Sequence, residues 1–467
     1  MSNKKHSLTI FSLTMITVGS VDSIRNLPAT ALFGSQLIFY FLLGAVFFLI
    51  PTALVSAELA SGWAKQGGIY VWVKEAFGKK TGFLAIWLQW IENVIWYPTI
   101  LSFVAGTIGY LINPALTSNP SFLWAVIVTC FWGATVLNLR GMKSSAMFSS
   151  FCSLAGLLLP MSLIIGLGVV WITQGNPLQI NFDMPSIVPH LADKSMWVSL
   201  TAIIMSFCGI EIATVHANDV NNPQHAFPKA LVYSVGIILS TLILGSLAIA
   251  VVLPGKDINL VAGIMQAFEA FFSRYNMSWM MPVVAVMLVL GGLGGVSNWI
   301  IAPTKGLLVA AEDGNLPELF QRTNSRGAPA VMLIAQALIV TVLSALFLFM
   351  PSVNGSYWLL TALAAQLYML MYLIMFIAAI KLRISQPNHH RPFKIPGGMM
   401  GLSFVSGIGI IGVLTTLAVS FIPPEGINVG STARYELTLI IGLFLMCAPP
   451  FISSWGKKHA VDAEVTA

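Results

Sequence analysis

Long apolar segments recur along the whole chain, and they constrain its fold more than any other feature. A segment of about 20 apolar residues is long enough to cross the hydrocarbon core of a bilayer as one helix. This rule predicts twelve spans, so both termini are expected on the same side of the membrane. The predicted spans are 8–32, 36–61, 82–112, 121–139, 146–173, 196–217, 228–253, 279–310, 331–350, 356–384, 401–422 and 436–455.

The composition agrees with a chain that lies mostly inside a membrane. Hydrophobic residues make up 57% of the 467 residues and charged residues only 9%, and the mean hydropathy is +0.84. Soluble domains carry roughly 25% charged residues, so this composition excludes a soluble globular protein. We therefore expect an all-α integral membrane protein.

The positive charges are concentrated on one side of the predicted spans. Loops on the side of the N-terminus hold seventeen Lys and Arg residues, whereas loops on the other side hold four. Because an excess of Lys and Arg marks cytoplasmic loops, both termini are predicted to be cytoplasmic. The seventeen residues are spread over seven segments, so the net charge of +6 does not indicate a nucleic-acid partner.

The sequence contains no motif that indicates catalysis or a bound cofactor. It has no HExxH helix, no Gly-rich phosphate loop and no nucleophile motif. The four cysteines lie in apolar stretches without CxxC spacing, which does not favour a metal site or a disulfide. We therefore expect no enzymatic activity, no cofactor and no metal.

The first and sixth predicted spans are interrupted in their apolar middle. The first contains GSVDS at 19–23, and the sixth contains Gly209 and Glu211. Each of these spans begins a set of five, and matching interruptions in two halves indicate a transporter built from inverted repeats. Alternatively, the small residues only allow close helix packing, but packing does not require the ionisable residues beside them.

The interruptions also predict the kind of ligand. An unwound helix exposes backbone N–H and C=O groups, which need partners inside a membrane. The start of the second half-helix favours an anion, and carbonyl groups at the end of the first half-helix can accept hydrogen bonds from an ammonium group. Because a free amino acid carries both groups, we predict an amino acid site near the bilayer midplane.

Asp22 and Arg25 lie in the first interruption, at a depth where an unpaired charge is costly. Residues three apart on a helix can pair and neutralise each other. Alternatively, Arg25 binds a side-chain carboxylate of the substrate while Asp22 receives an amine or a proton, or Arg25 extends to an aqueous vestibule. The sequence leaves these interpretations open, and we favour a cavity-facing Arg25 whose charge Asp22 partly balances.

Several segments resemble parts of the amino acid–polyamine–organocation (APC) transporters. They are AELASGWAKQGGIYVWVKEAFG at 57–78, FCGIEIATVHANDVNNPQHAFPKA at 207–230 and AAEDGNLPELFQRTNSRGAPA at 310–330. Within this superfamily the chain is most similar to bacterial glutamate/γ-aminobutyrate antiporters, through VLPGKDINLVAGIMQAF (252–268), SNWIIAPTKG (297–306) and RPFKIPGG (391–398). The resemblance implies twelve transmembrane helices in a 5+5 inverted repeat, unwound helices 1 and 6, and a bacterial inner-membrane location.

The resemblance also implies roles for individual residues. Residues 22–24 match the unwound backbone that holds the substrate carboxylate, Asn93 and Trp299 match cavity walls, and two helix-10 tyrosines match a pair in the glutamate/γ-aminobutyrate group. The predicted substrate-binding residues are Asp22, Ser23, Ile24, Arg25, Asn93, Phe207, Gly209, Trp299, Tyr368 and Tyr372. Glu211 and Glu92 are candidates for proton coupling or gating.

Two departures from the resemblance affect the prediction of substrate and of pH gating. Asp22 stands where relatives have a small or apolar residue, and the tail is too short for the folded C-terminal plug of the glutamate/γ-aminobutyrate antiporters.

The expected organisation is one transporter domain at 1–455, with repeats at about 8–173 and 196–384, helices 11 and 12 at about 401–455, and a cytoplasmic tail at 456–467.

These observations together predict an amino acid antiporter that works by alternating access. One alternative is a proton-coupled amino acid symporter, which would use Glu211, Glu92 or Asp22. The other is a transporter-like membrane sensor. The expected partners are an amino acid substrate and the lipid bilayer, and the sequence leaves a homodimer open.

Overall fold

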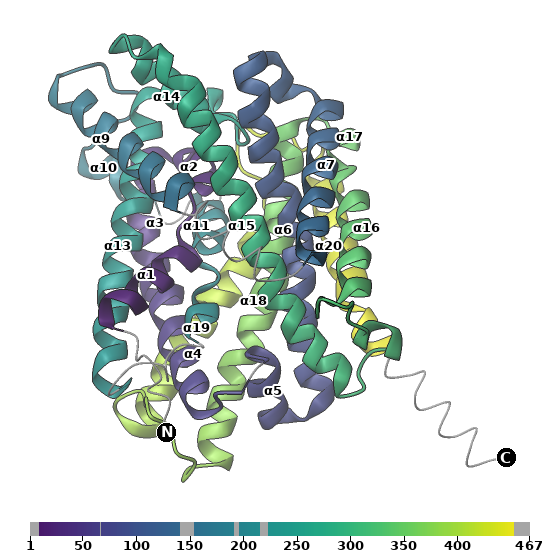
Figure 1. Ribbon diagram of the computed structural model, residues 1–467. Helices are drawn as coiled ribbons and strands as arrows, with labels where there is room; N and C mark the ends of the chain where they lie inside the picture. The colour runs from purple at the N-terminus through teal and green to yellow at the C-terminus, as the bar shows by residue number, and fades with distance from the viewer. Residues whose placement is uncertain (1–8, 66, 141–153, 191–195, 215–222, 453–467) are drawn as a thin grey trace, which may run out of the picture.

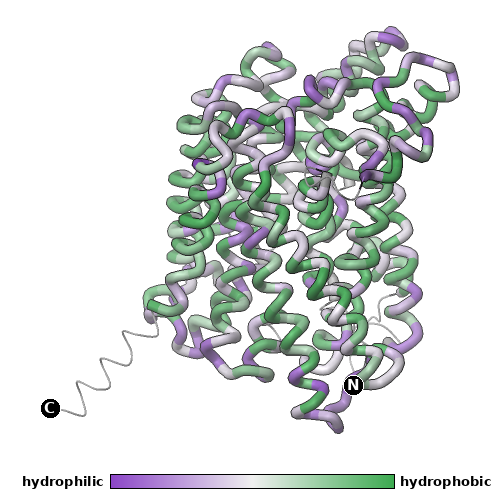
Figure 2. Tube along the Cα trace, turned by 180° about the vertical axis from the view of Figure 1, so that it is seen from behind, coloured by the Kyte–Doolittle hydropathy of each residue, from purple (hydrophilic) through white to green (hydrophobic). Residues whose placement is uncertain are grey.

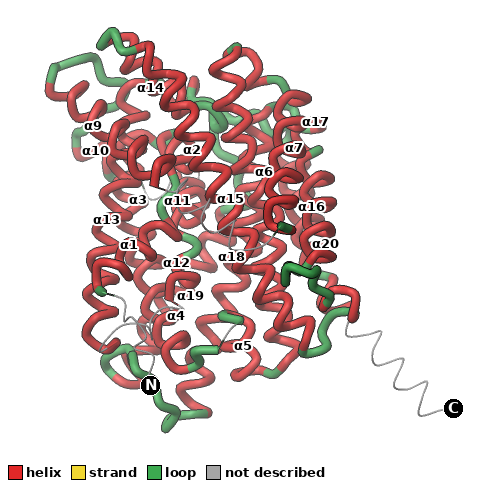
Figure 3. The backbone as a smooth tube through the Cα atoms, in the orientation of Figure 1, coloured by secondary structure: helices red, strands yellow, loops and turns green. Residues whose placement is uncertain are grey.

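All regular structure in the described residues of the chain is helical (Figure 3). The computed structural model describes residues 9–65, 67–140, 154–190, 196–214 and 223–452. The helices run up and down in one bundle, with α5 (Ile69–Phe77) at one end and α14 (Gly263–Arg274) at the other (Figure 1). We call these ends the α5 side and the α14 side.

Within the part of the chain that the structure describes, ten helical segments are long and apolar enough to cross a membrane. The helices of the bundle, in chain order with α5 and α14 omitted, are α1 (Ile10–Val21), α2 (Leu27–Ala31), α3 (Leu37–Gly44), α4 (Ile50–Gly62), α6 (Lys79–Ile112), α7 (Pro120–Leu139), α9 (Leu159–Thr173), α10 (Met184–Ile187), α11 (Ser199–Phe207), α12 (Ile210–Thr214), α13 (Pro223–Val252), α15 (Met281–Glu312), α16 (Ala330–Ser344), α17 (Leu346–Phe349), α18 (Val353–Ser385), α19 (Gly398–Val419) and α20 (Thr432–Cys447).

The two remaining expected spans are the interrupted ones. Span 1 is divided into α1 and α2, and span 6 is divided into α11 and α12. Together with the ten continuous segments they confirm the twelve-span, all-α fold with broken helices 1 and 6. The predicted tail at 456–467 lies outside the described residues.

Side-chain caps explain where several spans begin. The side chains of Asn119, Ser352 and Ser431 accept hydrogen bonds from backbone N–H groups in the first turns of α7, α18 and α20. Such caps satisfy N–H groups that have no partner within the helix. The predicted starts of these three spans, at 121, 356 and 436, lie one, three and four residues after the observed ones.

Helix α6 lies at the centre of the bundle and packs extensively against both α15 and α18. Both α6 and α15 contain an internal proline, Pro98 and Pro303 respectively. Hydrophobic residues cover the middle of the bundle, and hydrophilic residues gather mostly in the loops at its two ends (Figure 2). Polar residues of these helices are nonetheless buried inside the bundle, among them Glu92, Asn93 and Gln366.

Helix α14 was not expected from the sequence. It buries Phe268, Phe271 and Phe272 completely and carries Arg274 in its last turn. With 12 residues it is too short to span a bilayer. It packs against α13 and α15 instead.

Candidate functional site

The break in span 1 lies at Asp22 and Ser23. The Asp22 N–H still donates to the Val18 carbonyl oxygen at 2.8 Å, which closes α1. Asp22 (φ −69°, ψ 129°) and Ser23 (φ −149°, ψ 118°) are then extended, and the chain resumes as a 3-10 turn at Ile24–Asn26. Extended residues leave the regular helical hydrogen-bond ladder, so the backbone groups around Ser23 are available to other partners.

The break in span 6 depends on a glycine. Cys208 is extended and Gly209 has φ +105°, a conformation that side chains rarely tolerate. A Cβ atom at Gly209 would lie 2.8 Å from the Trp299 ring and 2.9 Å from the Ser20 carbonyl oxygen. The breaks of spans 1 and 6 and the Trp299 side chain are therefore in direct contact.

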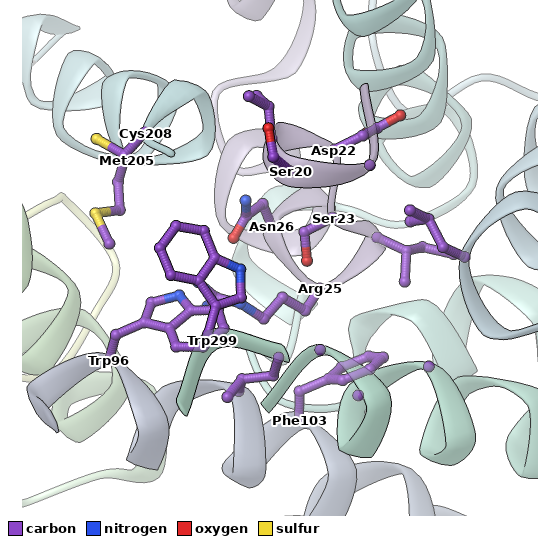
Figure 4. A pocket seen from close by; sticks show the side chains of 18 of the residues that line it. Ser20, Asp22, Ser23, Arg25, Asn26, Trp96, Phe103, Met205, Cys208 and Trp299 are labelled. Carbon is purple, nitrogen blue, oxygen red and sulfur yellow. The ribbon is translucent and has the colours of Figure 1, made fainter. Parts of the chain in front are cut away.

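A cavity lies between the two breaks (Figure 4). Eight of the predicted residues line it: Asp22, Ser23, Ile24, Arg25, Glu92, Asn93, Trp299 and Tyr368. Trp96, Ile100 and Phe103 of α6 also line it, as do Gly291, Gly292 and Gly295 of α15. We call it the central cavity.

Arg25 extends into this cavity from the break in span 1 (Figure 4). Its side chain is buried, and Nη1 donates to Thr99 Oγ1 at 3.1 Å and to Tyr357 OH at 3.2 Å. The guanidinium lies over the Trp96 ring, with Cζ 4.7 Å from the ring centroid. Nε has no hydrogen-bond partner among the described residues. All of these partners are neutral groups, so none of them neutralises the charge of Arg25.

Asp22 points away from Arg25 (Figure 4). Its Oδ2 accepts a hydrogen bond from Thr241 Oγ1 of α13 at 2.8 Å, and its Oδ1 has no partner among the described residues. No ion pair within 4.0 Å joins Asp22 to Arg25. The interpretation that these two residues lock the break as a pair is therefore wrong for this conformation, because the extended backbone at 22–23 turns the two side chains to different helices.

Glu211 is surrounded by hydrogen-bond donors. Tyr368 OH and Gln89 Nε2 donate to Oε1 at 2.6 and 2.9 Å, and Tyr372 OH donates to Oε2 at 2.5 Å. The Gly209 N–H in turn donates to Tyr372 OH at 3.2 Å. Glu211 is only 2% exposed. This network connects the break of span 6 to the two predicted tyrosines of α18.

Glu92 and Asn93 lie side by side in the wall of the central cavity. Asn93 Nδ2 donates to Glu92 Oε2 at 3.0 Å and to the Gln89 carbonyl oxygen at 2.8 Å. Glu92 is 2% exposed and Asn93 is 1% exposed. No group of three or more His, Cys, Asp or Glu side chains suited to a metal occurs among the described residues.

Four of the predicted residues lie outside the lining of the central cavity: Glu211, whose hydrogen-bond network is described above, and Phe207, Gly209 and Tyr372. Phe207 is completely buried with its ring 5.6 Å from that of Phe41, so it packs toward α3. The Tyr372 ring packs against Phe48 at 5.0 Å, and only its hydroxyl group reaches the Glu211 network. Gly209 does not line the cavity but lies directly against the ring of Trp299, which does.

The sequence reasoning missed several residues of the site. Trp96 lies beneath Arg25, and its ring is 5.7 Å from that of Trp299. The helical spacing of Asn93, Trp96, Ile100 and Phe103 could have revealed this face of α6, because residues three or four apart on a helix are neighbours. No comparable signal marks the long-range partners of Arg25 and Asp22, which are Thr99, Tyr357 and Thr241.

Comparisons with known proteins cover the whole bundle. A family model described as amino acid permease matches residues 8–445. An uncharacterized transporter of Legionella pneumophila is 48% identical over 459 residues, which are 98% of each chain. A glutamate/gamma-aminobutyrate antiporter of Lactococcus lactis is 31% identical over 458 residues, 97% of this chain and 90% of the relative. A probable agmatine/putrescine antiporter of Lactococcus lactis is 22% identical over 448 residues, 96% of this chain and 94% of the relative.

Proposed function

This chain belongs to the amino acid permease family of the APC superfamily, and from that premise we propose that it exchanges an acidic amino acid for a second amino acid or its decarboxylation product. The family makes the chain a multi-pass membrane transporter for a small molecule rather than an enzyme. The exchange is of the glutamate/γ-aminobutyrate kind, and it proceeds by alternating access around the central cavity.

The observation that carries the proposal is the environment of Arg25. A buried charge is costly unless it is paired, yet no carboxylate lies within 4.0 Å of this guanidinium among the described residues. Its Nε has no partner there, and its Nη1 binds only hydroxyl groups. Glu92 acts on Arg25 only through longer-range electrostatics, so a substrate carboxylate in the central cavity would supply the direct ion pair, with charge-assisted hydrogen bonds.

The extended backbone at 22–23 supports a second contact to the same substrate. Its polar groups lie beside Arg25 in the lining of the cavity. An amino acid with two carboxylates can place one on the backbone of the break and the other on Arg25. Its ammonium group would then face the carboxylate of Glu92 across the cavity. A neutral amino acid has only one carboxylate, so it can engage the backbone of the break or Arg25 but not both.

The proposed location is the bacterial inner membrane, with the α5 side and both termini in the cytoplasm. The support is the distribution of Lys and Arg, seventeen on this side against four on the other. Tags at both termini should be protected from an externally added protease in intact cells, and a tag in the 174–195 segment should be accessible to it. Termini on opposite sides would contradict both the topology and the twelve-span arrangement.

A counterflow assay in proteoliposomes tests the function. Vesicles are preloaded in turn with each amino acid and each decarboxylation product, and uptake of labelled glutamate is followed. We expect uptake only when an accepted substrate is inside. Uptake into empty vesicles under a proton gradient would favour the symporter instead, and the absence of transport with every candidate would favour a sensor.

A further inference from the structure

A second cavity opens on the α5 side of the bundle. We call it the vestibule. Its walls come from the segment between α4 and α5, from α6, from α12 and from α15. Its lining includes Trp63, Lys65, Trp72, Gln89, Glu211 and Lys305.

One polar layer separates the vestibule from the central cavity. Tyr368 lines the central cavity, and its hydroxyl group donates to Glu211 Oε1 at 2.6 Å. Glu211 lines the vestibule, as does Gln89, which donates to the same oxygen. A substrate that travels between the central cavity and the α5 side therefore passes through the vestibule.

The vestibule contains more positive than negative charge. Lys65 and Lys305 line it, and neither makes an ion pair with a carboxylate of the described residues within 4.0 Å. Glu211 is the acidic residue of the lining, and its two oxygens already accept hydrogen bonds from three side chains. The two ammonium groups are thus left to attract an anion from outside.

Lys305 occupies an unusual position for a lysine. It lies within the eighth span that the sequence predicts (279–310), beyond the apolar segment Ser278–Ser297 and six residues after Trp299 on the same helix α15, and its side chain is only partly exposed. A charged residue inside a span is costly and marks a functional path more often than a structural one. Helix α15 thus contributes Trp299 to the central cavity and Lys305 to the vestibule.

We propose that Lys305, assisted by Lys65, forms an outer binding site for the carboxylate of an acidic amino acid, on the α5 side of the Tyr368–Glu211 layer. The inference rests on the proposed function, because it assigns the route by which the acidic substrate reaches Arg25. Like charges that line a cleft raise the local concentration of an oppositely charged ligand. The outer site therefore favours acidic substrates before they meet the central cavity.

The test measures uptake of labelled glutamate from each side, in inside-out and right-side-out membrane vesicles that are preloaded with unlabelled substrate. For Lys305→Gln we expect the KM at the α5 side to rise about threefold or more, with the KM at the α14 side and the maximal rate unchanged. The KM of the wild type at the α5 side should rise with ionic strength, because salt screens the attraction. This dependence should weaken in the variant and return in Lys305→Arg.

Two further variants keep the test decisive. Lys65→Gln should produce the same sided effect at an exposed position, even if Lys305→Gln folds poorly. Lys381→Gln removes an exposed charge at the end of α18, outside the vestibule lining, and should change neither KM. Wild-type vesicles that take up no acidic amino acid would overturn the proposed function. Normal wild-type uptake with equal effects, or none, on both sides would overturn the outer site alone.

Discussion

Asp22 and Arg25 are three residues apart in sequence but bind to different helices. Asp22 accepts a hydrogen bond from Thr241 of α13 at 2.8 Å, whereas Arg25 donates to Thr99 of α6 and to Tyr357 of α18. The extended backbone at the break makes this divergence possible. As a result, Arg25 faces the central cavity without the carboxylate that the sequence places nearest to it.

Independent roles predict that a double variant shows no rescue. Arg25→Gln should lower glutamate uptake about tenfold or more, because a charge-assisted hydrogen bond contributes about 1.5–3 kcal/mol, and should shift preference toward neutral amino acids. Asp22→Asn should impair transport through its contact with Thr241. Because the two side chains share no hydrogen bond or ion pair, the double variant should not recover the loss of either single variant. Glutamate uptake in proteoliposomes measures the loss in each variant, and Arg434→Gln at an exposed position is the control. Recovery of uptake in the double variant would show that Asp22 and Arg25 pair in another conformation of the transporter.

Trp299→Ala should abolish transport while leaving expression and folding intact. The ring forms a wall of the central cavity and contacts both Trp96 and the break at Gly209. Trp279→Ala is the matched control, because that side chain is 70% exposed on the surface. Uptake and size-exclusion profiles of both variants provide the measurement. Near-normal uptake by Trp299→Ala would show that the ring lies at the rim of the path.

The two tyrosines of the Glu211 network should respond differently to loss of the hydroxyl group. Tyr368→Phe removes a donor at the boundary of the two cavities and should mainly change the rate of exchange. Tyr372→Phe removes a group that binds both Glu211 and the Gly209 N–H, so it should mainly lower stability, by about 1–3 kcal/mol. Thermal unfolding in detergent and initial exchange rates separate these effects. Identical profiles for the two variants would contradict the assignment.

Asp313 should stabilise the fold in a pH-dependent manner. Hydrogen bonds from Lys74 and Tyr70 lower the pKa of Asp313, which follows the end of α15, below its ordinary value of 3.8. A lowered pKa in the folded state means stabilisation that is fully present above 3.8 and is lost as the pH falls through the lowered value. Asp313→Asn should therefore reduce the unfolding temperature at pH 7, and its difference from the wild type should shrink in acid. Glu312→Gln, at an exposed neighbouring position, is the control; a difference that grows in acid would contradict this sign.

Glu58→Gln should unfold the protein more easily without changing substrate preference. Glu58 is 3% exposed and binds Arg383 at 2.9 and 2.5 Å and the Ile395 N–H at 2.8 Å. Removal of one partner from such a buried pair costs about 3–5 kcal/mol. The variant should therefore melt at a lower temperature than exposed Glu75→Gln, while the residual transport keeps its order of substrates. A changed order of substrates would place Glu58 in the transport path.

Hydropathy alone predicted the twelve spans, because a bilayer demands long apolar helices and their lengths follow from its thickness. The breaks were also visible, since Gly209 and the GSVDS stretch interrupt otherwise apolar spans. The directions of Asp22 and Arg25 were not predictable. They depend on Thr241 and Tyr357, which are 219 and 332 residues away in sequence. Helix α14 was missed because its apolar face is shorter than a span.

Pro303 interrupts the hydrogen bonding of helix α15 between the residues that line the two cavities. A proline cannot donate to the carbonyl oxygen four residues earlier, and its ring crowds that oxygen; here the carbonyl belongs to Trp299. The helix therefore lacks the backbone hydrogen bond to the carbonyl oxygen of Trp299, the residue whose side chain lines the central cavity. Bending at this point would redirect the Trp299 ring while the segment that bears Lys305 stays packed against Ile86 of α6 through Gly306. The part of α15 that lines the central cavity can therefore move independently of the part that lines the vestibule, with the bend at Pro303.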